Sequence, residues 1–86
     1  MNIYNLPNAK SNFYLNRYIK LITICKNIHF EGYTETHHIL PKSMGGCDSN
    51  FNLIVLSSRL HFIAHYLLWK AYRNYSMSQA FIMMNG

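Results

Sequence analysis

Histidine supplies the chemistry that stands out in this sequence, because four of its five histidines fall into two close pairs. His37 and His38 are adjacent within ETHHILPKSMGG, residues 35–46, whereas His61 and His65 are four residues apart. Residues four apart on a helix lie on the same side and can bind one metal ion together. Adjacent residues of a strand point to opposite faces, so the first pair cannot easily share one role.

Two strands and a helix are expected to position these pairs. The segment YTETHHIL, residues 33–40, alternates and is rich in Tyr, Thr and Ile, which favours a strand. Pro41 ends this strand because proline cannot donate to a β ladder. LIVL, residues 53–56, predicts a second strand, so that the two form a hairpin joined by a long loop. The amphipathic segment 59–73 predicts the helix that follows.

Serine residues mark the expected starts of the helices. Apolar residues at three-to-four spacing predict a helix over residues 12–27, with Ser11 as its N-cap. Ser57 or Ser58 would cap the helix that carries the second histidine pair. From Ser76, the letters SMSQ fit a capping box and predict a short C-terminal helix. The predicted fold class is therefore α+β, a hairpin-and-helix unit with an N-terminal packing helix and a short C-terminal helix.

This arrangement lets the two histidine pairs converge. One of the adjacent histidines would face the helical pair and complete a three-nitrogen site, and the other would stay free. A metal ligand offers its lone pair to a cation, whereas a general base keeps its lone pair for a proton. Two neighbouring imidazoles can divide these tasks. The alternative is that each histidine is an ordinary core or boundary residue, which is how we interpret His29.

Length, composition and charge indicate a small globular protein with a polyanionic partner. Half of the 86 residues are hydrophobic and 15% are aromatic, which predicts one domain, residues 1–86, that could be a fragment of a longer protein. Eight Lys and Arg against three acids give a net charge of +5, which favours nucleic acid over a merely basic surface. Cys25 and Cys47 lack zinc-knuckle spacing, and reduced thiols fit a cytoplasmic location. No signal peptide or membrane-spanning run is evident, so we expect no membrane association.

The segment of residues 33–73 resembles the HNH nuclease motif, also called the ββα-metal or His-Me finger. The resemblance depends on six residues: Glu35, His37, His38, Asn52, His61 and His65. The intervals between them are two, one, fourteen, nine and four residues, beginning with the pattern E-x-H-H. The segment is most similar to HNH homing endonucleases encoded by phages, and the same pattern occurs in colicin-type nuclease toxins. The resemblance implies a metal-dependent DNA endonuclease that hydrolyses phosphodiester bonds.

The resemblance also implies a metal site. His37, His61 and His65 would bind one divalent metal ion, which stabilises charge on the phosphoryl group and the leaving oxygen. Three imidazole ligands suit zinc, nickel or cobalt, whereas nuclease turnover commonly uses magnesium or manganese. The identity of the ion therefore stays open among Mg, Mn, Zn and Ni. No small-molecule cofactor is expected.

The remaining motif residues take catalytic roles by the same resemblance. His38 would act as the general base that deprotonates the attacking water. Asn52 would brace the hairpin loop through hydrogen bonds to backbone, so that His38 is held correctly. Glu35 would orient one of the metal-binding histidines. Leu60 stands where the phage relatives often have glutamate, and we expect this departure to leave the mechanism intact.

The expected substrate is double-stranded DNA, bound through its phosphates. Helix N-termini and basic groups bind phosphates without reading sequence. Four basic residues are candidates for this contact: Lys42, Arg59, Lys70 and Arg73. Ordinary solvated charge is the alternative for each.

Two other functions stay open on the sequence. The first is a non-catalytic nucleic-acid-binding module in which the same histidines hold a structural metal. The second is a toxin nuclease domain with an acidic immunity partner.

Overall fold

The computed structural model describes residues 4–73 of the 86-residue chain. Two helices and a two-stranded antiparallel sheet make up its regular structure, with two 3-10 helices in the loop between the strands. The elements are α1 (Asn12–Cys25), β1 (Glu35–His38), η1 (Lys42–Met44), η2 (Asn50–Asn52), β2 (Leu53–Leu56) and α2 (Ser58–Tyr72). The predicted α+β class is confirmed. The short helix predicted from Ser76 lies outside the described residues.

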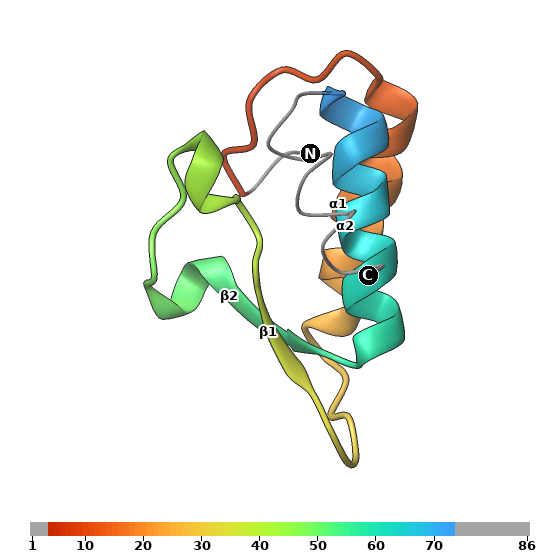
Figure 1. The fold of residues 1–86 in the computed structure, drawn as a ribbon, viewed down its shortest axis with the longest axis vertical. Coiled ribbons are helices and arrows are strands. Elements are labelled where there is room, and N and C mark those ends of the chain that lie inside the picture. The colour runs from red at the N-terminus through yellow and green to blue at the C-terminus, as the bar shows by residue number, and fades with distance from the viewer. Residues whose placement is uncertain (1–3, 74–86) are drawn as a thin grey trace.

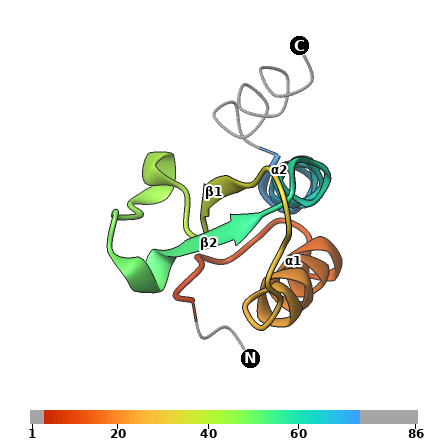
Figure 2. The same cartoon turned by 90° about the horizontal axis from the view of Figure 1, so that it is seen from below.

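The two helices lie side by side, and the sheet crosses one end of the pair (Figure 1). Figure 2 shows the loop with η1 and η2 on the side of the sheet away from the helices. Both helices begin where serine was predicted to cap them. Ser11 accepts a hydrogen bond from the backbone N–H of Tyr14 at 3.4 Å, and Ser57 accepts one from the backbone N–H of Leu60 at 3.3 Å. These caps satisfy backbone donors that a helix end leaves unpaired.

Strand β2 has the predicted bounds, but β1 is shorter than predicted. It covers Glu35–His38, two residues shorter at each end than predicted, and Asn52 binds the residues that follow it. The N–H of Ile39 donates to the backbone carbonyl of Asn52 at 2.8 Å, and the N–H of Leu40 donates to its side-chain oxygen at 2.8 Å. Asn52 therefore binds the backbone N–H groups of the two residues that follow β1.

The register of the sheet decides which side chains meet the helices. His37 pairs with Ile54, and both are buried, whereas the neighbouring pair of Thr36 and Val55 is exposed. Side chains of a strand alternate between faces, so Glu35 shares the inner face with His37. Among the described residues, the buried polar side chains are His37 and Asn52, and the other buried residues form a hydrophobic core. The largest fully buried side chains are Tyr18, Ile22, Ile39, Leu56, Leu68 and His37. Within residues 4–73, no helix is both long enough and apolar enough to cross a membrane.

Candidate metal centre and catalytic residues

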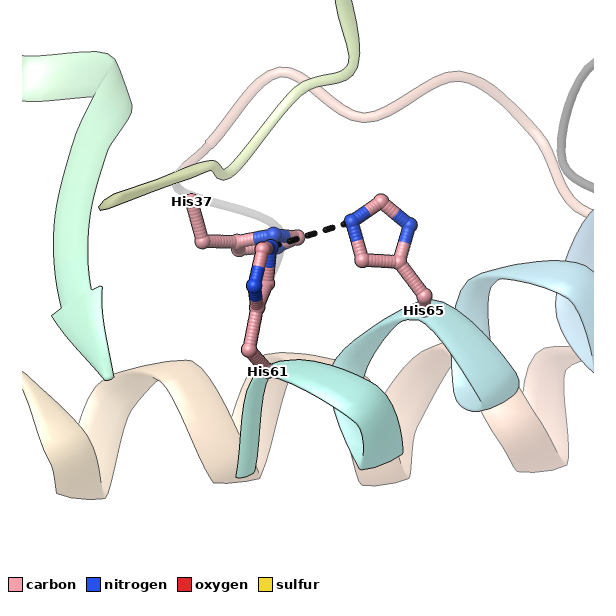
Figure 3. Close-up of side chains that lie close together, drawn as sticks. All are labelled: His37, His61 and His65. Carbon is pink, nitrogen blue, oxygen red and sulfur yellow. Dashed lines mark hydrogen bonds between the residues drawn. The ribbon is translucent and has the colours of Figure 1, made fainter. Parts of the chain in front are cut away.

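Three of the predicted site histidines form one cluster (Figure 3). His37 projects from β1, while His61 and His65 project from the same side of α2. The ring centroid of His37 lies 5.1 Å from that of His61 and 5.0 Å from that of His65, and the two helical rings are 4.8 Å apart. One ring nitrogen of each can be chosen so that all three lie within 4.8 Å of one another. The predicted metal-ligand set is thus brought together.

Glu35 fixes the orientation of His61. Its Oε1 lies 2.7 Å from Nδ1 of His61, and its other oxygen accepts a hydrogen bond from the Ser58 hydroxyl at 3.2 Å. Hydrogen bonds from His61, Tyr33 and Ser58 hold the pKa of the Glu35 carboxyl below its usual value, so the carboxylate acts only as an acceptor. The proton of neutral His61 therefore sits on Nδ1, and its Nε2 carries the lone pair.

Tyr18 fixes the orientation of His37 from the first helix. Its hydroxyl donates to the carbonyl of Ile39 at 2.7 Å and also lies 2.7 Å from Nε2 of His37. A phenol has one proton, and a carbonyl can only accept, so Nε2 of His37 must donate to the phenol oxygen. The lone pair of His37 is therefore on Nδ1, which is buried and has no hydrogen-bond partner. The sequence places Tyr18 only on an apolar helix face and does not show what its hydroxyl contacts.

Burial keeps His37 and His65 neutral. Desolvation, with smaller effects of the neighbouring histidines, lowers the pKa of His37 to about 2. Burial and then the proximity of His61 lower the pKa of His65 to about 4. A neutral imidazole offers a lone pair that a protonated ring lacks, so the cluster is ready to bind a cation at neutral pH.

The spacing of the two helical histidines also suits a metal ion. The Nε2 atoms of His61 and His65 are 3.2 Å apart. Tetrahedral zinc with Zn–N bonds of about 2.0–2.1 Å places its ligand nitrogens about 3.3 Å apart. The donor set and the 3.2 Å spacing of the helical pair therefore fit a divalent metal, and one nitrogen of His37 lies within 4.8 Å of both.

His38 points away from the cluster, as expected for the neighbour of an inward residue. Its Nε2 lies 2.7 Å from Oδ1 of Asp48, and about a third of its side chain, 31%, is exposed. The other oxygen of Asp48 accepts from Nζ of Lys42 at 3.2 Å. The sequence does not single out Asp48, because a strand residue and a loop residue ten positions apart follow no pattern that predicts a contact.

Asn52 ties the end of β1 to the loop. Its side-chain oxygen accepts from the N–H of Leu40 at 2.8 Å, and its Nδ2 donates to the carbonyls of Leu40 at 3.0 Å and Cys47 at 2.8 Å. The loop approaches closely here, since a Cβ at Gly46 would collide with the carbonyl oxygen of Leu40. The backbone hydrogen bonds expected of Asn52 are therefore present, and they hold the residues directly after His38.

The four basic residues predicted to contact DNA occupy separate places. Lys42 is paired with Asp48 in the loop, and Arg59 is exposed in the first turn of α2. Nζ of Lys70 lies 5.2 Å from the ring centroid of Tyr14. Cζ of Arg73 lies 4.9 Å from the ring centroid of Trp69. Arg59 and Arg73 are fourteen residues apart, which is about 21 Å along a helix. These residues do not form one compact patch.

The chain is similar in sequence to several proteins of one phage. It is 52% identical to Probable mobile endonuclease B of Enterobacteria phage T4 over 52 residues, which is 60% of this chain and 20% of that protein. It is 54% identical to Probable mobile endonuclease E of the same phage over 52 residues, 60% of this chain and 37% of that protein. Probable mobile endonuclease C is 46% identical over 55 residues, 64% of this chain and 26% of its own length. The chain thus spans well under half of each of these relatives. No family model and no solved structure matches it.

Proposed function

We propose that this chain carries the nuclease core of an HNH-type, metal-dependent DNA endonuclease of phage origin. The observation that carries the proposal is the cluster of His37, His61 and His65, with His38 free of it on the opposite face of the same strand. The arrangement of hairpin and helix around the cluster fits a ββα-metal finger. The T4 relatives, which are named probable mobile endonucleases, support nuclease activity.

The division of tasks follows from the two faces of β1. A divalent metal held by the three clustered histidines would stabilise negative charge on the phosphoryl oxygens and the leaving 3′-oxygen. His38, whose ring is partly exposed, would accept the proton of the attacking water. The proton acceptor is separate from the metal ligands, so neither task competes with the other for a lone pair.

Two further residues would hold this machinery in place. Glu35 accepts the Nδ1 proton of His61, which would leave Nε2 of that ring available to hold a metal. Asn52 would fix the backbone that follows His38, and a displaced base loses its reach to the water. The substrate would be double-stranded DNA in the host cytoplasm, with Lys42 in the loop and Arg59 at the helix start as phosphate contacts.

Nicking of supercoiled plasmid under metal titration tests the proposal. We expect cleavage that requires Mg, Mn, Zn or Ni and stops with EDTA. His37→Ala should weaken metal binding, whereas His38→Ala should leave metal binding unchanged and abolish cleavage. Glu31→Ala, which removes an exposed carboxylate outside the cluster, serves as the control. Cleavage that survives both EDTA and His38→Ala would refute the mechanism, and equal loss of metal binding in the two histidine variants would refute the assignment of roles.

A second candidate function is a non-catalytic nucleic-acid-binding module with a structural metal. The burial of His37, which is 1% exposed, favours this alternative, because structural metal sites are closed. It predicts that metal removal unfolds the chain and that no metal raises cleavage above background. Metal-dependent turnover lost in His38→Ala would exclude it.

A further inference from the structure

The loop between the strands presents one carboxylate to the free histidine. Asp48 lies between η1 and η2, and its Oδ1 is 2.7 Å from Nε2 of His38. Lys42, at the start of η1, binds the other oxygen of Asp48 at 3.2 Å. The two oxygens of the carboxylate are therefore engaged by different partners, which restricts its rotation. In turn, the contact fixes the plane of the His38 ring.

The same contact decides which nitrogen of His38 carries the proton. Hydrogen bonds from His38 and Lys42 hold the pKa of the Asp48 carboxyl below its usual value, so at neutral pH the group is a carboxylate. A carboxylate only accepts hydrogen bonds, so Nε2 of His38 must donate. In the neutral ring, Nδ1 then has the lone pair. A proton acceptor needs that lone pair free of protein partners.

The loop that carries Asp48 is itself anchored. Nδ2 of Asn52 donates to the carbonyl of Cys47, the residue immediately before Asp48, at 2.8 Å. The same side chain binds both backbone groups of Leu40, two residues after His38. Asn52 thus connects the backbone on both sides of the Asp48–His38 contact. This anchoring distinguishes the pair from an ion pair between two unrestrained surface side chains, which contributes little.

We propose that Asp48 is a positioning residue for the general base, holding His38 as the Nε2–H tautomer so that Nδ1 accepts the proton of the attacking water. This inference rests on the proposed nuclease function. It adds to that function a residue outside the six-residue motif and assigns the reacting nitrogen. Asp48 acts through His38 and contacts neither the metal ligands nor, by this proposal, the reacting phosphate.

The state of the His38 ring is tested directly by nitrogen-15 NMR on the full chain, without DNA. We expect the wild-type spectrum to show the Nε2–H tautomer with an Nε2–H proton slow enough in exchange to be observed. Asp48→Ala should lose this proton signal and mix the tautomers, whereas Asp48→Asn, whose amide oxygen still accepts, should retain the tautomer. The opposite tautomer in the wild type, or an unchanged His38 spectrum in Asp48→Ala, overturns the proposal. Because Asp48 is exposed, we expect both variants to fold.

Cleavage kinetics test the functional half of the proposal. Asp48→Ala should lower kcat by about tenfold or more, up to the about 10²–10⁴-fold that general-base catalysis contributes as a whole. Its KM for DNA should not rise, because the variant removes a negative charge that repels phosphate. A merely structural role would instead weaken kcat, DNA binding and metal binding together. Asp48→Asn should recover part of kcat, and the matched control Glu31→Ala should change neither constant.

A double-variant cycle separates the two proposals. In the His38→Ala background, Asp48→Ala should have no further effect on the low residual rate that single-turnover assays at excess enzyme measure, because the residue that it positions is gone. An equal loss of kcat in both backgrounds overturns the role of Asp48 while the nuclease function stands. Absence of metal-dependent nicking in the wild type refutes the nuclease function, and the NMR result still decides whether Asp48 sets the tautomer of His38.

Discussion

The hydroxyl of Tyr18 offers a sharp test of how the candidate metal site is built. Tyr18→Phe removes one oxygen atom and keeps the ring that fills the core. The change leaves two buried groups without their partner, the Nε2–H of His37 and the carbonyl of Ile39, which the hydroxyl contacts at 2.7 Å each. Each unsatisfied buried group costs about 1–3 kcal/mol, so we expect the metal-free protein to lose about 2–6 kcal/mol of stability.

The same change should weaken metal binding for a separate reason. Without the phenol, His37 can place its proton on either nitrogen, and one of these tautomers blocks Nδ1 as a ligand. Loss of a partner that fixes a metal-binding histidine typically costs about 10–100-fold in affinity. We expect a decrease of that size in zinc or nickel affinity, measured by competition with a chromophoric chelator at a temperature where the variant is folded. Denaturant unfolding of the metal-free protein gives the change in stability.

Tyr72→Phe is the matched control for this prediction. Its hydroxyl donates to the carbonyl of Pro7 at 2.8 Å, so the variant also deletes one hydroxyl that binds distant backbone. Tyr72→Phe should lower stability and leave metal affinity unchanged, because neither Tyr72 nor Pro7 belongs to the cluster. Wild-type metal affinity in Tyr18→Phe, or an equal loss in Tyr72→Phe, would refute the reasoning that links Tyr18 to the tautomer of His37.

Two further predictions concern the loop anchor and acid stability. Asn52→Ala should lower the free energy of unfolding by about 3 kcal/mol or more, because three hydrogen bonds to the backbone of Leu40 and Cys47 are lost at a buried position. Denaturant titration measures this change, and a decrease below about 1 kcal/mol would contradict the prediction. Acid should destabilise the metal-free protein: burial lowers the pKa of His37 to about 2, whereas the unfolded chain binds the proton near its ordinary value of 6.5. The unfolded state therefore binds more protons between these values, so stability is complete above about pH 6.5 and decreases by about 1.4 kcal/mol per unit as pH decreases below it. His37 alone should make the stabilities at about pH 7 and about pH 5 differ by about 2 kcal/mol, and His65, whose pKa is lowered to about 4, adds to this difference in the same direction. A pH-independent stability over this range would contradict the buried neutral His37.

The elements that position the site were predictable because they depend on local signals. Serine caps, the LIVL run and the apolar periodicity of α2 predicted both helices and β2 to within a few residues. The i, i+4 spacing of His61 and His65 was enough to place those rings on one side of the helix. Residue spacing also indicated that one of the adjacent histidines would join them.

The contacts that fix the imidazoles could not be predicted in the same way. Tyr18 and His37 are 19 residues apart, and Asp48 is 10 residues from His38, so no periodic pattern relates the partners. Each contact depends on how α1 or the loop packs against β1, which is a tertiary property. The C-terminal end of β1 is a similar case. The β-rich sequence predicts a strand up to residue 40, but the side chain of Asn52 binds the backbone of Leu40, which is also a tertiary contact.

In the proposed mechanism, the register of β1 separates the tasks of the two adjacent histidines. Side chains alternate along a strand, so Glu35 and His37 face α2 while His38 faces the loop. A slip of one residue would turn His38 toward the helical pair and place His37 beside Asp48, exchanging ligand and base. Asn52 prevents this slip by binding the backbone of Leu40 through both its donor and its acceptor, a pairing that a shifted strand could not keep. In the proposed mechanism, Asn52 would therefore do more than brace His38: it would help to determine which of the two neighbouring histidines becomes the ligand and which stays free.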